Sequence, residues 1–117
     1  MVLLFPSLAL GETMNDLVVR DGIYYKKFSE VPFSGKITGN TQGSFRNGKK
    51  HGPYVQYHNN GQLWSKGDYK DGKAVGPWVG YWENGQISTK ETYKDGKRDG
   101  PWVSYNKDGT KLPRIIQ

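Results

Sequence analysis

Cysteine is missing from all 117 residues of this sequence. Disulfide bonds, thiolate metal sites and cysteine nucleophiles are therefore excluded. Other signatures of catalysis are missing too, since no serine stands in a G-x-S-x-G elbow and no glycine-rich phosphate loop precedes a helix. The two histidines, His51 and His58, have no Asp or Glu at metal-ligand spacing. We therefore expect no enzyme active site, metal or cofactor, and no small-molecule substrate.

Hydrophobic residues are also scarce, at 34% of the chain, whereas glycine reaches 16 residues and aromatic residues make up 14%. This profile is typical of a turn-rich β protein in which aromatic side chains, each covering ~150–250 Å², do most of the burying. A helical bundle would need more leucine and alanine. The length is that of one domain, and we expect its core to be thin and extended.

The first eleven residues, MVLLFPSLALG, differ from the rest. Their apolar run is shorter than the ~20 residues that span a bilayer. Ala9-Leu10-Gly11 has the small-x-small form of a signal-peptidase site, although no basic residue precedes the run. We expect residues 1–11 to be a partial signal-peptide-like segment, and the protein to be periplasmic or secreted, in the cell envelope. The alternatives are an apolar N-terminal strand and a cytoplasmic location.

A phrase of glycine, lysine and aromatic residues recurs three times with a period of 24 residues. Each copy reads G-K-x-x-G-P-[YW]-V-x-Y-x-x-[ND]-G, and the units begin at Phe45, Tyr69 and Tyr93. A fixed period of this length indicates a repeat protein. We interpret residues 12–44 as a diverged N-terminal hairpin unit, and residues 45–117 as three repeats with a C-terminal cap.

Each repeat contains two Asx-Gly pairs, with their glycines at positions 48, 61, 72, 85, 96 and 109. Such pairs between aromatic and β-branched runs are the strongest short signal for a β-hairpin. A proline at the start of a strand is tolerated there, and no room remains for the crossovers that parallel strands need. The predicted fold is all-β: an elongated, twisted antiparallel sheet of about eight strands, built from tandem hairpins.

The repeated phrase resembles the MORN-repeat-variant family, where MORN stands for membrane occupation and recognition nexus. The resemblance extends from Leu17 to Gly109, and the stretch Leu17–Lys36, with its D-G-I-Y-Y-K-K run, is similar to bacterial members. It implies a MORN-like repeat fold that contacts protein or membrane. The bacterial members are frequently labelled as antitoxins of toxin–antitoxin systems.

The hairpin register decides which residues share a face. A three-residue loop, Glu83-Asn84-Gly85, would place Gly85 in the left-handed conformation and Tyr81 opposite Ile87. A two-residue loop would instead place Tyr81 opposite Ser88. We prefer the first register because it collects apolar residues on one face.

This register predicts two faces of different roles. The packing face, or structural repeat core, comprises Val55, Tyr57, Leu63, Tyr69, Val79, Tyr81, Ile87, Tyr93, Val103 and Tyr105. The binding face comprises Tyr54, Trp64, Lys66, Trp78, Trp82, Lys90 and Trp102. The alternative for the tryptophans is that they pack under adjoining loops.

The net charge of +6 favours acidic partners, although lysines in solvated turns also keep a repeat protein soluble. Nucleic acid is not expected, because acidic residues are spread among the basic ones and no nucleic-acid-binding signature is present. The predicted function is a non-enzymatic repeat scaffold that binds another protein or an anionic envelope surface through its aromatic and basic face. The alternative is an antitoxin-like inhibitor that sequesters a toxin protein.

The proposed signal site can be checked by expressing the chain with a restored basic start in a secreting host. We expect a mature protein that begins at Glu12. Intact-mass measurement would detect the cleavage, and an uncut N-terminus in that host would contradict the envelope location.

Overall fold

The computed structural model describes residues 11–113, so the signal-like segment lies outside it except for Gly11. Within this range the chain forms short and long β-strands and one turn of 3₁₀ helix. The bounds are β1 Glu12–Thr13, η2 Met14–Asp16, β2 Leu17–Arg20, β3 Ile23–Lys26, β4 Gly35–Thr38, β5 Thr41–Arg46, β6 Lys49–Tyr57, β7 Leu63–Lys70, β8 Lys73–Tyr81, β9 Ile87–Lys94, β10 Lys97–Arg98 and β11 Val103–Ser104.

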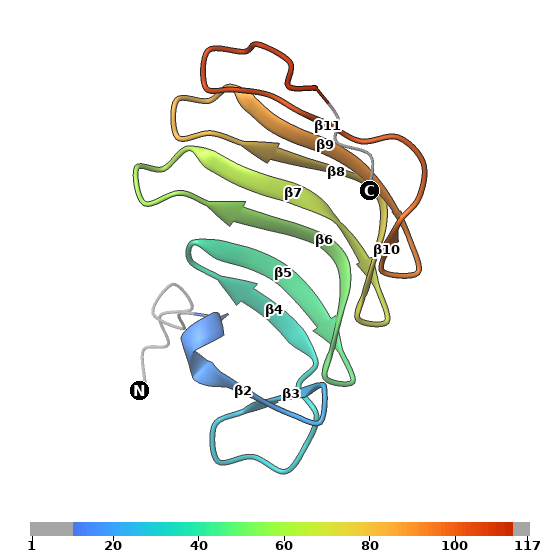
Figure 1. The fold of residues 1–117 in the computed structure, drawn as a ribbon. Helices are drawn as coiled ribbons and strands as arrows, with labels where there is room; N and C mark the ends of the chain where they lie inside the picture. The colour runs from blue at the N-terminus through green and yellow to red at the C-terminus, as the bar shows by residue number, and fades with distance from the viewer. Residues whose placement is uncertain (1–10, 114–117) are drawn as a thin grey trace.

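Most strands join one twisted sheet in sequence order, β4-β5-β6-β7-β8-β9-β10, with β1 beside β4 and β11 paired to β9. Every pairing in it is antiparallel except that of β1 with β4. The hairpin β2–β3 forms a separate two-stranded sheet at the N-terminal end (Figure 1). The described residues extend over 62 × 31 × 19 Å. The predicted elongated sheet of tandem hairpins is confirmed.

Two kinds of turn alternate along the sheet. Asn47, Asp71 and Asp95 have positive φ and each precedes a glycine of positive φ, which defines two-residue type I′ turns. At the other edge, Gly85 has φ +88° and Tyr81 pairs with Ile87. The three-residue loop and its register are therefore confirmed.

A β-bulge next to this loop changes the faces, however. Gly80 pairs with Thr89 while Tyr81 pairs with Ile87, so Ser88 is an extra residue in β9. Because an extra residue shifts the alternation by one, Tyr93 pairs with Gly76 and lies on the same face as Trp78. The prediction that Val79 and Tyr93 share a face is wrong, and Trp64 makes the equivalent bulge in β7.

Buried apolar side chains gather at the N-terminal end. Among the described residues they are Leu17, Phe33, Ile37, Phe45 and Tyr54. None belongs to the predicted packing face, whose members are all half-buried, and Tyr54, predicted to bind, is only 3% exposed. The physical reason is that Leu17, Tyr24 and Phe33, from the hairpin β2–β3 and the segment after it, pack with Phe45 at this end of the sheet, where Figure 1 shows the hairpin.

Aromatic rings pack directly on glycine backbone, both in this core and beyond it. A Cβ built on Gly43 would lie 2.5 Å from the Tyr54 ring, and one built on Gly67 would lie 2.0 Å from the Trp78 ring. The two glycines are one period apart, as are the two rings. In the next unit the position holds Glu91, which no ring can cover in this way, and the third unit forms only the short strands β10 and β11.

Side-chain hydrogen bonds join successive loops along one edge. Asn60 Nδ2 donates to the Glu83 carbonyl at 2.9 Å, and Asn84 Nδ2 donates to the Lys107 carbonyl at 2.8 Å. Along the other edge, the Gly72 N–H donates to the Lys50 carbonyl at 2.8 Å. Each hairpin is thus fixed to the next at both ends of its strands.

Replacing Gly67 by alanine tests the packing of ring on glycine. Gly67 has no positive φ, so the expected loss of about 1–3 kcal/mol in the free energy of unfolding would come from overpacking against Trp78. Chemical denaturation measures this loss. In a Trp78→Ala background the same substitution should cost less than about 0.5 kcal/mol. Equal costs in both backgrounds would contradict the contact.

Candidate binding surface

A row of aromatic rings crosses one face of the sheet. The ring centroids of Tyr54 and Tyr69 are 5.1 Å apart, those of Tyr69 and Trp78 are 5.1 Å apart, and those of Trp78 and Tyr93 are 6.3 Å apart. All three pairs meet edge to face, the arrangement that the charge distribution of aromatic rings favours. We call Tyr54, Tyr69, Trp78 and Tyr93 the aromatic row.

The aromatic row begins in the core and leaves it. Tyr54 is buried, and Tyr69 and Trp78 pack against the core from outside. Trp78 and Tyr93 are half-buried, and a groove of about 410 Å³ opens beside them. Its lining includes Tyr69, Ala74, Trp78, Glu91 and Tyr93. We call it the Ala74 groove.

A lysine ammonium lies among the rings at the covered end of the row. Lys50 Nζ is 4.7 Å from the Tyr54 ring centroid, 5.0 Å from that of Tyr69 and 5.8 Å from that of Tyr24. Burial lowers the pKa of the Lys50 amine from its ordinary value. Attraction to the ring faces compensates part of the hydration that the ammonium loses.

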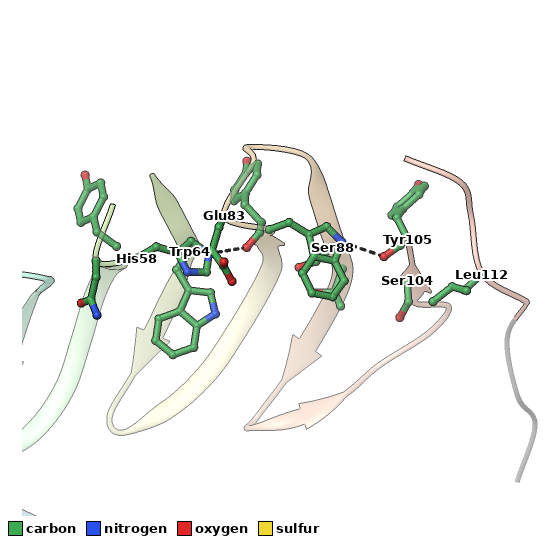
Figure 2. A pocket seen from close by; sticks show the side chains of 12 residues that line it. His58, Trp64, Glu83, Ser88, Ser104, Tyr105 and Leu112 are labelled. Atoms are coloured by element: carbon green, nitrogen blue, oxygen red, sulfur yellow. Dashed lines mark hydrogen bonds between the residues drawn. The ribbon is translucent and has the colours of Figure 1, made fainter. Parts of the chain in front are cut away.

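A second groove, of about 640 Å³, runs along the three-residue loops (Figure 2). His58 Nε2 donates to the Tyr81 carbonyl at 2.8 Å, and one unit later Trp82 Nε1 donates to the Tyr105 carbonyl at 3.0 Å. The His58 ring stacks on Trp64, which is 50% exposed. His58 and Trp82 therefore have structural partners, whereas Trp64 has an open ring.

The opposite face of the sheet carries a different row. Pairing across successive strands aligns Val55 with Lys66, Lys66 with Val79, Val79 with Lys90, and Lys90 with Val103. Directly paired residues share a face, so this row alternates half-buried valines with exposed lysines. We call it the valine–lysine row.

The predicted binding face is therefore divided. Tyr54 and Trp78 belong to the aromatic row, Lys66 and Lys90 to the opposite face, and Trp64 and Trp82 to the loop groove. Trp102 lies apart from these, under the Arg98 guanidinium, whose central carbon is 4.4 Å from the ring centroid. The prediction that they form one surface is wrong because the bulges at Trp64 and Ser88 shift the alternation. A binding role for each of them stays a prediction.

A basic edge, which the sequence reasoning missed, follows the type I′ turns. Cations face each other directly across three successive turns, in the pairs Arg46–Lys49, Lys70–Lys73 and Lys94–Lys97. Like charges opposite each other are destabilising, and only the first pair has a carboxylate bonded to it, Asp71 at 3.1 Å from Arg46. The signal was present in the sequence, since these cations flank Asx-Gly with the 24-residue period.

Arg46 also affects the titration of its partner. Its hydrogen bond to the Asp71 carboxylate holds the pKa of Asp71 below the ordinary value. Asp71 therefore stays ionised and offsets part of the charge at this end of the basic edge. The other two cation pairs have no such salt bridge within residues 11–113.

Two further searches concern other kinds of site. Within residues 11–113, no cluster of three or more His, Cys, Asp or Glu side chains has an arrangement that could hold a metal ion. No helix in the same range is long and apolar enough to span a membrane.

Comparison with known proteins identifies the repeat. The sequence model of a family described as "MORN repeat variant" matches residues 50–71 and 74–95. The predicted resemblance is confirmed for these two stretches, which together include β7 and β9 and all but the first residue of β6 and β8. No curated protein and no solved structure matches the chain.

The buried end of the aromatic row predicts a loss of stability in alkali. Burial, with Tyr69 and Tyr24 nearby, raises the pKa of Tyr54 to about 12, whereas an unfolded tyrosine titrates near ~10. Between these values the unfolded chain binds fewer protons, so stability is complete below pH ~10 and falls as the pH rises towards ~12. The loss from this residue is on the order of 2 kcal/mol.

Denaturant unfolding at a series of alkaline pH values measures this decline. Tyr54→Phe should make it shallower, with Tyr105→Phe as the control for removing one tyrosine hydroxyl outside the aromatic row. A Tyr54→Phe protein that declines as steeply as the wild type would contradict the buried hydroxyl.

Proposed function

We propose that this chain is a non-enzymatic scaffold that binds an acidic protein on the aromatic row and the basic edge. The observation that carries the proposal is the Ala74 groove, which opens where the aromatic row continues beyond the core. At its N-terminal end the row is packed into the core, where Tyr54 is buried, and at its C-terminal end the half-buried Trp78 and Tyr93 line the Ala74 groove. A partner that covered Trp78 and Tyr93 would continue the contact that β2–β3 begins.

The basic edge supports an acidic partner. Lys73 lines the Ala74 groove and belongs to the central cation pair, so the rings that line the groove and the cations of the basic edge are continuous. Three like-charged pairs cost stability in the free protein. An acidic surface would remove that repulsion, and such complementarity contributes mainly to association rate and specificity. The match to MORN repeat variants agrees with a repeat module for contact with protein or membrane.

The location and the class of partner remain part of the proposal. The signal-like N-terminal sequence favours the cell envelope as the place where the partner is found. If the partner is instead a toxin enzyme, the scaffold acts as an antitoxin-like inhibitor. An anionic membrane surface is the second candidate, and the observation that favours it is the series of cation pairs along one edge of the sheet, which would attract anionic lipid headgroups.

Two charge-matched double variants test the proposal. Lys73→Glu with Lys97→Glu reverses two cations of the basic edge, while Lys66→Glu with Lys90→Glu makes the same change in charge on the valine–lysine row. Proteins captured from envelope extract are crosslinked and measured by quantitative mass spectrometry. We expect the basic-edge variant to lose its partner about tenfold or more, and the valine–lysine variant to retain it.

The same proteins are then sedimented with phosphatidylglycerol vesicles. If no protein partner is captured, and if only the basic-edge variant loses a salt-sensitive sedimentation with the vesicles, the function is binding to the membrane surface. If both variants capture the partner like the wild type, the proposed surface is wrong. Circular dichroism melting confirms that the variants are folded.

A further inference from the structure

One position in the repeat holds a cation in two units and a small side chain in the unit between them. It directly follows the lysine of each G-K pair, and it is Lys50, then Ala74, then Arg98 at intervals of 24 residues. The aromatic residue four positions later is present in all three units, as Tyr54, Trp78 and Trp102.

In the first and third units the cation lies on that aromatic ring. Lys50 Nζ is 4.7 Å from the Tyr54 ring centroid, and the central guanidinium carbon of Arg98 is 4.4 Å from that of Trp102. Two units of one chain thus show the same local solution, a cation packed against the face of the ring that follows it.

The second unit has the rings without the cation. Trp78 and Tyr93 meet at 78°, as Tyr54 and Tyr69 meet at 82°. Where Lys50 projects over the first pair, Ala74 ends at its methyl group, and the Ala74 groove of about 410 Å³ occupies the place. This groove is large enough for a flexible alkyl chain that ends in a compact charged group.

We propose that the Ala74 groove binds the ammonium group of a lysine side chain presented by a partner protein, in the place that Lys50 fills in the preceding unit. The source of the lysine rests on the proposed function, but the preference for an ammonium does not. Recognition uses the negative ring faces of Tyr69, Trp78 and Tyr93, which attract cations and disfavour anions.

The charged groups around the groove leave recognition of the ligand to the aromatic rings. The Glu91 carboxylate lines it, accepts a hydrogen bond from the Tyr93 hydroxyl at 2.9 Å and forms an ion pair with Arg98. Lys73 lines the other side and belongs to the basic edge, so its charge opposes the ligand's. The first unit has the equivalent neighbour, Lys49, and there Lys50 Nζ lies among the rings beside it.

The indole N–H of Trp78 provides a direct reporter. It donates to the Asp68 carbonyl at 3.2 Å, and the chain has four tryptophans, so its NMR signal can be assigned with single Trp→Phe variants. The probe is Nα-acetyl-lysine N-methylamide, titrated into the full chain. Nα-acetyl-norleucine N-methylamide, which has a similar aliphatic chain but no charge, is the control.

We expect the lysine probe to shift the Trp78 signal saturably, with a dissociation constant on the order of millimolar, while norleucine leaves it unchanged. Ala74→Lys should abolish the shift, because its own ammonium fills the groove, and should raise the melting temperature by about 3 °C. Thr92→Lys is the matched control, since it adds the same charge on the opposite face and should retain binding.

Several results would overturn the proposal. Equal shifts with norleucine would make the groove an apolar site, and binding that survives Ala74→Lys would place the ligand elsewhere. No shift at saturating probe would leave no site at all. Tighter binding of choline than of the lysine probe would assign the groove to a quaternary ammonium. If these probes fail while the basic edge still captures a partner, the Ala74 groove is wrong and the proposed function stands.

Discussion

The contact of an aromatic ring with a bare glycine backbone is the interaction on which this sheet depends. A sheet of one layer has no facing layer against which its side chains could pack, so its apolar groups must find partners within their own face. Tyr54 on Gly43 and Trp78 on Gly67 provide such partners, because a missing Cβ lets the ring lie against the neighbouring strand. Rings held in this way lie low and in line, which produces the edge-to-face series from Tyr54 to Tyr93. The proposed binding surface is therefore a by-product of how the fold is stabilised.

Sequence reasoning predicted what depends on local backbone chemistry. Asx-Gly pairs specify their turns through positive φ, so the hairpins, their order and the pairing of Tyr81 with Ile87 could be read from the letters. The faces of the sheet could not be predicted in this way, because no property of Ser88 or Trp64 identifies either residue as the extra residue of a bulge. A single uncounted residue moved Tyr93 to the side of Trp78. The core was missed for another reason: Leu17, Phe33 and Ile37 lie outside the repeats, where no period shows which side chains meet.

The departures from the repeat carry more functional information than the repeat itself. Ala74 interrupts a series of cations, and a groove lies beside it. Glu91 stands where a third glycine would continue the series of Gly43 and Gly67, and the third unit forms only the short strands β10 and β11. Both positions can be found by writing the units beneath one another, yet their meaning depends on which rings lie nearby. In the basic edge the repeat itself is informative, because an unfavourable pair of like charges recurs in every unit and this recurrence suggests a partner of opposite charge.

The placement of the core at one end gives the molecule a polarity. Each hairpin bonds through its loops only to its neighbours, as Asn60 does to the next loop and Gly72 to the preceding strand. In such a one-dimensional array, order propagates from the unit that can form first, and within residues 11–113 the buried core lies at the N-terminal end. Folding should therefore proceed unit by unit from Phe45 towards Val103, and thermal unfolding should begin at the C-terminal end of the sheet. The rings proposed to bind a partner lie in the part that folds last, so a bound protein would also stabilise the end of the sheet that unfolds first.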